Sequence, residues 1–148
     1  MRGRSVNRTA ALIVGAVYLL VGIGGFFVTK FEHFATYDTG KLLGIFQINP
    51  LHNIVHIVIG LFLLGAARGH RGARRANTSV GAAYALVFVL GLFLAPKTSS
   101  ANFLALNQAD NGLHLATAVL LLAVALLADK AYTRHGHPTA VTGGATRL

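Results

Sequence analysis

Two short segments of the sequence combine histidine, asparagine and aspartate at the point where an apolar run begins. They are NPLHNIVH at positions 49–56 and NQADNGLH at positions 107–114. Residues four apart lie on the same face of an α-helix, so His52 is aligned with His56, and Asp110 with His114. Ionisable groups inside an apolar segment are by default candidates for function.

These side chains allow several chemistries, which the sequence leaves open. Three imidazoles and a carboxylate form an acceptable ligand set for zinc, and copper or iron also accept such donors. On facing helices, two histidines can also hold a b-type haem between them. Proton or quinol chemistry is a further interpretation, because imidazole titrates near neutral pH. The metal set is therefore His52, His56, Asp110 and His114, and the cofactor-binding pair is His56 and His114.

The asparagines of the two segments have a structural interpretation. Asn49 before a proline is typical of a helix start, and Asn107 with Asp110 three residues later resembles a capping box. A structural polar network is the alternative to a ligand site. In that network neutral imidazoles would hydrogen-bond to Asn53 and Asn111 and lock the helices together.

Composition places these segments in a membrane. Hydrophobic residues make up 54% of the 148 and charged residues 11%, whereas about 25% of an ordinary soluble domain is charged. Apolar runs of about 20 residues, the length that crosses the hydrocarbon layer, lie at about 9–28, 50–67, 78–95 and 108–129. The sequence therefore predicts an all-α, integral membrane four-helix bundle over residues 9–129.

The basic residues predict the orientation of the chain. There are 13 Lys and Arg against 4 Asp and Glu, and most of the basic residues lie in residues 1–8, in Arg68–Arg75 and in the tail, 130–148. By the positive-inside rule both termini are cytoplasmic in a cell-membrane protein, and the polar tail is expected to be disordered. Because the charge is divided among membrane-flanking segments, nucleic-acid binding is not expected.

The chain resembles a helical hairpin present in two tandem copies. At an offset of 58 both polar segments read Asn-x-x-x-Asn-x-x-His, and at an offset of 66 Gly15-Ala-Val-Tyr18 aligns with Gly81-Ala-Ala-Tyr84. The first helices of both pairs run in the same direction, so the copies would be parallel repeats related by a pseudo-two-fold axis along the membrane normal. That symmetry would bring the two histidine stripes face to face.

The loop at residues 29–48 is the longest polar interruption. Its aromatic and aliphatic residues suit a short interfacial helix, and an ordinary packed loop fits as well. Glu32, His33 and Asp38 in this loop are candidates for extra ligands or for a lid over the histidines.

The motifs carry a resemblance to a known family. Asn-x-x-His-x-x-x-Gly at 53–60, with Leu-His-Leu at 113–115, resembles a group of small actinobacterial four-helix membrane proteins classed as a domain of unknown function. The resemblance runs from Arg8 to Ala131. It implies four helices and a cell-membrane location, and it implies no activity and no catalytic residue.

The remaining motifs do not favour an enzyme. The sequence has no cysteine, which excludes disulfides, thiolate ligands and covalent haem attachment. The common nucleophile, phosphate-binding and zinc-protease motifs are missing as well. The predicted role is a non-enzymatic subunit or accessory factor of a larger membrane assembly, or a homo-oligomer, within the lipid bilayer. The alternative is a metal- or haem-binding redox or transport protein that uses the histidine and aspartate cluster near the extracellular ends of the second and fourth helices.

Overall fold

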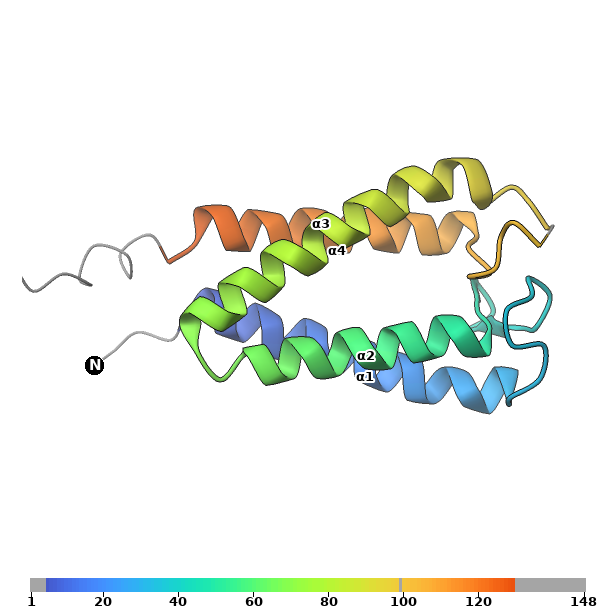
Figure 1. Cartoon of the computed structure of the whole chain (residues 1–148), viewed down its shortest axis with the longest axis horizontal. Helices are drawn as coiled ribbons and strands as arrows, with labels where there is room; N and C mark the ends of the chain where they lie inside the picture. Colours follow the sequence, from blue (N-terminus) through green and yellow to red (C-terminus); the bar gives the residue numbers. More distant parts are fainter. Residues whose placement is uncertain (1–4, 99, 130–148) are drawn as a thin grey trace, which may run out of the picture.

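The computed structural model describes residues 5–98 and 100–129 as a bundle of four helices (Figure 1). The helices are α1 (Val6–Thr29), α2 (Pro50–Ala66), α3 (His70–Leu94) and α4 (Gln108–Leu127). A two-stranded antiparallel hairpin, β1 (Lys41–Leu42) with β2 (Phe46–Gln47), lies in the loop between α1 and α2. The predicted all-α class with four helices is confirmed.

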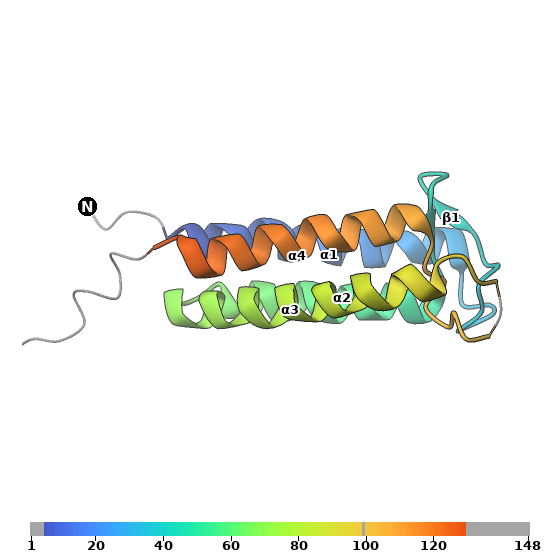
Figure 2. The same ribbon diagram turned by 90° about the horizontal axis from the view of Figure 1, so that it is seen from above.

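Consecutive helices run antiparallel and form two hairpins, α1 with α2 and α3 with α4. The start of α1 and the end of α4 lie at one end of the bundle, and the α1–α2 and α3–α4 loops lie at the other end (Figure 1). Turned by 90°, the bundle shows α4 beside α1 and α3 beside α2 (Figure 2). We call residues 30–49 the long loop and residues 95–107 the short loop.

Three of the helices are long and apolar enough to cross a membrane. They are α1, α3 and α4, with 24, 25 and 20 residues. The apolar α2 has 17 residues, or roughly 25 Å at ~1.5 Å per residue, against a hydrocarbon thickness of about 30 Å. Large apolar side chains point outward from the helices: Leu20, Phe93 and Leu127 are 69%, 65% and 66% exposed.

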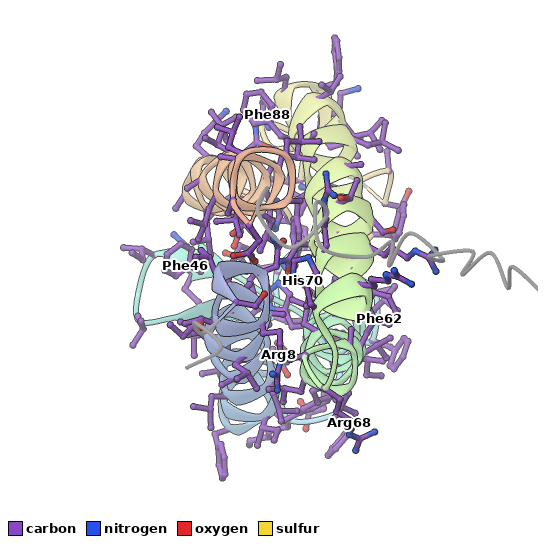
Figure 3. The ribbon with its side chains drawn as sticks, turned by 90° about the vertical axis from the view of Figure 1, so that its left-hand side faces the viewer. Arg8, Phe46, Phe62, Arg68, His70 and Phe88 are labelled. Atoms are coloured by element: carbon purple, nitrogen blue, oxygen red, sulfur yellow. The ribbon has the colours of Figure 1, made fainter. Side chains whose placement is uncertain are left out.

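Helix α3 begins earlier than the sequence predicted. Its apolar run was expected from residue 78, with Arg68–Arg75 in a loop, whereas the helix begins at His70. The expectation was wrong because it placed the start of the helix at the start of the apolar run. Arginine is a good helix former, and its long side chain reaches polar surroundings from the first turns of a helix. Viewed from the end of the bundle where α3 begins, Arg68 and Phe62 point outward, whereas His70 lies toward the middle (Figure 3).

The long loop contains no helix among its described residues, and only its last three residues, 47–49, are buried. The interfacial helix considered for residues 29–48 is therefore wrong, and the segment is a loop that carries the short β-hairpin. Leu43 and Gly44 have φ angles of 52° and 77°, in the left-handed region that turns the chain between β1 and β2 and that glycine adopts without steric cost. The predictions made for residues 1–4 and for the tail, 130–148, lie outside the described residues.

Within each hairpin, a matching contact joins the two helices. The Nε atom of Arg8 donates to the carbonyl of Ala67 at 2.8 Å, and Nε of Arg74 donates to the carbonyl of Ala125 at 2.8 Å. Each arginine thereby satisfies a carbonyl at the carboxyl end of its partner helix, where the helix dipole also favours a cation.

The tightest helix contacts match in the same way. A methyl group added at Gly25 would overlap the side-chain oxygen of Asn53, and one added at Gly91 would overlap that of Asn111. Glycine lets the helices of each hairpin approach at these two points, as small residues do in membrane helix pairs.

Candidate functional site

Three histidines converge between α2 and α4, at the end of the bundle that carries the loops. His52, His56 and His114 are 2%, 3% and 2% exposed. One ligand atom from each lies within 4.8 Å of the other two, and the Nε2 atoms of His52 and His56 are 3.1 Å apart. The predicted convergence of imidazoles from the second and fourth helices is present in the structure.

Asn49 fixes the start of α2 and thereby the position of the first histidine. Its side-chain oxygen accepts the backbone N–H of His52 at 2.8 Å, and Pro50 occupies the first helical turn. The amide of Asn49 donates to the carbonyl of Thr36 at 2.9 Å and to that of Phe103 at 2.7 Å. The residue is therefore the predicted helix cap, and it also joins the long and short loops over the site.

Asn107 and Asp110 form the predicted capping box at the start of α4. Asn107 Oδ1 accepts the N–H of Asp110 at 3.0 Å, and Asp110 Oδ2 accepts the N–H of Asn107 at 3.2 Å. The amide of Asn107 donates to the carbonyl of Ile45 in the long loop at 2.7 Å. Asp110 is buried one turn before His114, but the group of converging ligand atoms consists of the three histidines without it.

Asn53 and Asn111 do not hydrogen-bond to the imidazoles, so this part of the predicted polar network is wrong. Asn53 donates to Thr29 Oγ1 at 3.0 Å, and both asparagines pack against a glycine of the preceding helix. The physical reason is the helical twist of ~100° per residue. Asn53 follows His52 directly and so faces the other helix of its own hairpin.

The converging side chains leave several buried polar atoms without a partner. Among the described residues, Nδ1 of His52, His56 and His114 and the hydroxyl of Tyr84 make no hydrogen bond. Nearly all buried polar groups in proteins are hydrogen-bonded, and an unpartnered group calls for an explanation such as a bound ion or water. Four such atoms around one cluster make it a candidate for a bound ion or water.

Two tyrosines pack against the histidine cluster. The ring of Tyr18 meets that of His56 edge-on, with centroids 4.9 Å apart, and the ring of Tyr84 lies 5.1 Å from that of His114. The hydroxyl of Tyr18 is hydrogen-bonded to Thr117 Oγ1 at 2.8 Å. Thr117 was not singled out from the sequence, because a threonine in an apolar helix carries no distinctive signal.

Two cavities adjoin the histidines. The smaller, of about 50 Å³, is lined by the three imidazoles, Tyr84 and apolar side chains, namely Val55, Ile59, Ala83, Val87, Leu104 and Leu106. The larger, of about 240 Å³, lies between α1 and α4 and reaches Tyr18, His56 and Thr117. One water needs at least about 10–15 Å³, so the smaller cavity has room for an ion with a small ligand.

The acidic and imidazole side chains of the long loop do not join the cluster. Glu32, His33 and Asp38 are exposed, and none belongs to the group of converging ligand atoms. Residues from the short loop, Leu104 and Leu106, cover the site in their place.

A second polar cluster lies at the opposite end of the bundle, and the sequence did not reveal it. The carboxylate of Asp129 accepts the backbone N–H groups of Val6 and Asn7 at 3.1 and 3.0 Å and the hydroxyl of Ser5 at 2.7 Å. His70 Nδ1 lies 3.4 Å from the same carboxylate. Partial burial alone would raise the pKa of Asp129, but the hydrogen bonds from Asn7, Ser5 and Val6 outweigh it and lower the pKa to about 2.

With this geometry established, similarity to known proteins gives one result. Residues 8–127, most of the chain, match the family model described as "Domain of unknown function (DUF4383)". The chain belongs to this family. The match includes all four helices and the three converging histidines, and it confirms the resemblance seen in the motifs. No curated protein and no solved structure matches the chain.

Proposed function

We propose that this member of the DUF4383 family is an integral membrane protein that binds one transition-metal ion, zinc, copper or iron, through His52, His56 and His114. The observation that carries the proposal is the convergence of three buried imidazoles within 4.8 Å. No catalytic role is assigned to these residues. The site is a candidate for metal storage, transport or electron transfer.

The spacing of the imidazoles supports coordination. Imidazole nitrogens bind zinc at ~2.0–2.1 Å, so two of them in a tetrahedral site lie about 3.3 Å apart. The Nε2 atoms of His52 and His56 are 3.1 Å apart, so a small side-chain rotation suffices. The i, i+4 spacing on α2 provides this pair, and His114 provides the third nitrogen from α4.

A haem is less well supported than a single ion. His56 and His114 come from two helices, as axial ligands would, but the cavity that both of them line has a volume of about 50 Å³. Sites for small organic ligands usually have volumes of about 300–1,000 Å³. A macrocycle would require the helices to separate.

The proposed architecture is a duplicated transmembrane hairpin with both termini on the cytoplasmic side of the cell membrane. The matching contacts of Arg8 with Ala67 and of Arg74 with Ala125, at identical distances, are what a parallel pseudo-two-fold axis would produce. Outward-facing apolar side chains support contact with lipid. The short α2 would place His52 and His56 just beneath the extracellular surface.

The metal site is compatible with a role as an accessory subunit or homo-oligomer. Apolar side chains exposed on the helices, such as Phe93 and Leu127, can be covered by neighbouring protein as well as by lipid. Cross-linking in native membranes followed by identification of the attached chains tests this role. Recovery of uncross-linked monomer alone would contradict it.

The metal proposal is tested by purifying the full chain in detergent and measuring bound zinc, copper and iron by mass spectrometry, with a visible spectrum to detect haem. We expect about one ion per chain. The double variant His56→Ala/His114→Ala should lose the ion, and His33→Asn, an exposed histidine with φ of 52° where asparagine is tolerated, should keep it. A folded wild-type chain that binds none of the three ions when they are supplied would refute the proposal.

A further inference from the structure

The chemistry around the three histidines also indicates which ion they bind. We propose that the ion is monovalent copper, Cu(I), and not a divalent ion. This inference depends on the metal site proposed above and adds to it the charge and the coordination number of the ion.

The ligands themselves bring no negative charge to the site. Neutral imidazoles are good donors, but unlike carboxylates or thiolates they do not offset the charge of the ion. The cost of transferring an ion from water to an apolar interior grows with the square of its charge, so it is about fourfold greater for a divalent ion than for a monovalent one. A site built from three neutral ligands and apolar walls therefore favours the lower charge.

One buried carboxylate is available as a counter-charge. Asp110 is 2% exposed and precedes His114 by one helical turn on the same face of α4. Of the other acidic residues, Glu32 and Asp38 are exposed in the long loop, and Asp129 binds the start of α1 at the opposite end of the bundle. The carboxyl group of Asp110 is not among the converging ligand atoms, so it would act as a counter-charge and not as a ligand, and it can supply at most one negative charge.

The number of ligands fits the same ion. Zinc in proteins is almost always four-coordinate and completes a three-histidine set with water or hydroxide. Apart from the imidazoles and Tyr84, the cavity beside the histidines is lined by carbon, with Leu104 and Leu106 covering it. A hydroxide held there would have few hydrogen-bond partners. Cu(I), by contrast, is stable with three nitrogen ligands in a trigonal arrangement and needs no fourth.

Oxidised copper fits the site poorly. Cu(II) prefers square-planar or tetragonal sets of nitrogen and oxygen ligands. The rings of His52 and His56 meet edge-on along one helix, with their planes inclined by 64°, and His114 approaches from another helix. Apart from Tyr84, the other residues that line the adjoining cavity are apolar. We therefore expect the protein to stabilise copper in its reduced state.

The test compares Cu(I) with Zn(II) on the full chain in detergent micelles. Under anaerobic conditions with ascorbate, Cu(I) affinity is measured by competition with bicinchoninate, and Zn(II) affinity by competition with a chromogenic zinc chelator. We expect one Cu(I) per chain and an affinity for Zn(II) at least about 100-fold weaker, because uncharged ligands and apolar walls penalise the divalent ion more. X-ray absorption at the copper edge should show three nitrogen ligands.

Variants separate the site from the fold. His56→Ala should weaken Cu(I) binding by at least about 100-fold. Replacing residues that only hold a ligand in place already lowers metal affinity by up to about 100-fold, and a ligand itself should matter at least as much. Asp110→Asn keeps an oxygen to accept the Asn107 N–H, so it should leave α4 capped while weakening Cu(I) by about 10-fold. His33→Asn is the control for both, and circular dichroism with thermal melting establishes that each variant is folded.

The outcomes distinguish this inference from the proposal on which it rests. Binding of Zn(II) as tight as that of Cu(I), lost in His56→Ala, would overturn the choice of ion and leave the metal site standing. An unchanged Cu(I) affinity in Asp110→Asn would overturn the counter-charge argument. Failure of the folded wild-type chain to bind either ion would end both.

Discussion

Tyr18 and Tyr84 lie against each other at the centre of the bundle, with ring centroids 5.2 Å apart and ring planes inclined by 43°. They occupy the same position in the two hairpins, and each contacts one histidine: Tyr18 meets His56 of α2, and Tyr84 meets His114 of α4. The pair thus links the two halves of the molecule where the imidazoles converge.

The hydroxyls of these two tyrosines differ, and so should the effects of removing them. The hydroxyl of Tyr18 bonds to Thr117 at 2.8 Å, so Tyr18→Phe leaves a buried threonine hydroxyl unpaired and should cost about 1 kcal/mol in the free energy of unfolding. The hydroxyl of Tyr84 has no partner among the described residues. Tyr84→Phe should therefore be neutral or stabilising when measured by unfolding in detergent, and equal losses for the two variants would contradict this account.

Gly25 should tolerate no side chain, whereas its neighbour Gly24 should. An alanine Cβ at Gly25 would overlap the side chain of Asn53, and one at Gly24 would meet nothing within 4 Å. Overpacking of this kind lowers the free energy of unfolding by about 1–3 kcal/mol. Gly→Ala at an open helical position raises it by about 0.5–1 kcal/mol. Thermal melting of the two variants in detergent should therefore move in opposite directions.

Two further variants test the origin of that loss. Gly91→Ala should reproduce it, because Gly91 meets Asn111 as Gly25 meets Asn53. Asn53→Ala removes the overlapped oxygen, so adding it to Gly25→Ala should cost less than the sum of the two single changes. Strict additivity of the two losses would argue against direct contact.

Acid should weaken the contact between Asp129 and the start of α1. The folded pKa of Asp129 is about 2, below the unfolded value of about 3.9. The ionised form is therefore stabilised by folding: its contribution is complete above pH about 4 and is lost as the pH falls toward 2. Unfolding measured across this interval should show a loss of stability in the wild type.

The control is Asp129→Asn, which cannot ionise. It should be less stable than the wild type at neutral pH, and the difference between the two should shrink as the pH falls from 4 to about 2. Other carboxyl groups titrate in both proteins, so the difference isolates Asp129. A difference that is constant with pH would mean that the charge contributes nothing.

The convergence of the histidines was predictable because it depends on local regularities. The i, i+4 spacing places His52 and His56 on one helix face, and the repeated Asn-x-x-x-Asn-x-x-His pattern predicts an equivalent face on the fourth helix. Capping by Asn49 and Asn107 was predictable for the same reason, since a cap is recognised within four residues of sequence.

Contacts between distant residues were not predictable. Asp129 meets Ser5 and Asn7 across more than 120 positions of sequence, and no periodicity reports such a pairing. Asn53 was wrongly assigned to the imidazoles. It packs against Gly25, and a glycine has no side chain by which the sequence could indicate this contact. The early start of α3 was missed because hydropathy marks the apolar segment and not the full helix.

The proposed orientation can be tested directly, because the chain contains no cysteine. Lys41→Cys lies in β1, at the end of the bundle that carries the long loop, and Arg71→Cys lies in the first turn of α3 at the other end. Both positions are exposed. With the termini cytoplasmic, as the distribution of basic residues predicts, a membrane-impermeant maleimide added to intact cells should label Lys41→Cys and leave Arg71→Cys unlabelled until the cells are opened. Labelling of Arg71→Cys alone in intact cells would invert the orientation and place the histidines near the cytoplasmic surface, and labelling of both would contradict an arrangement in which the helices span the membrane.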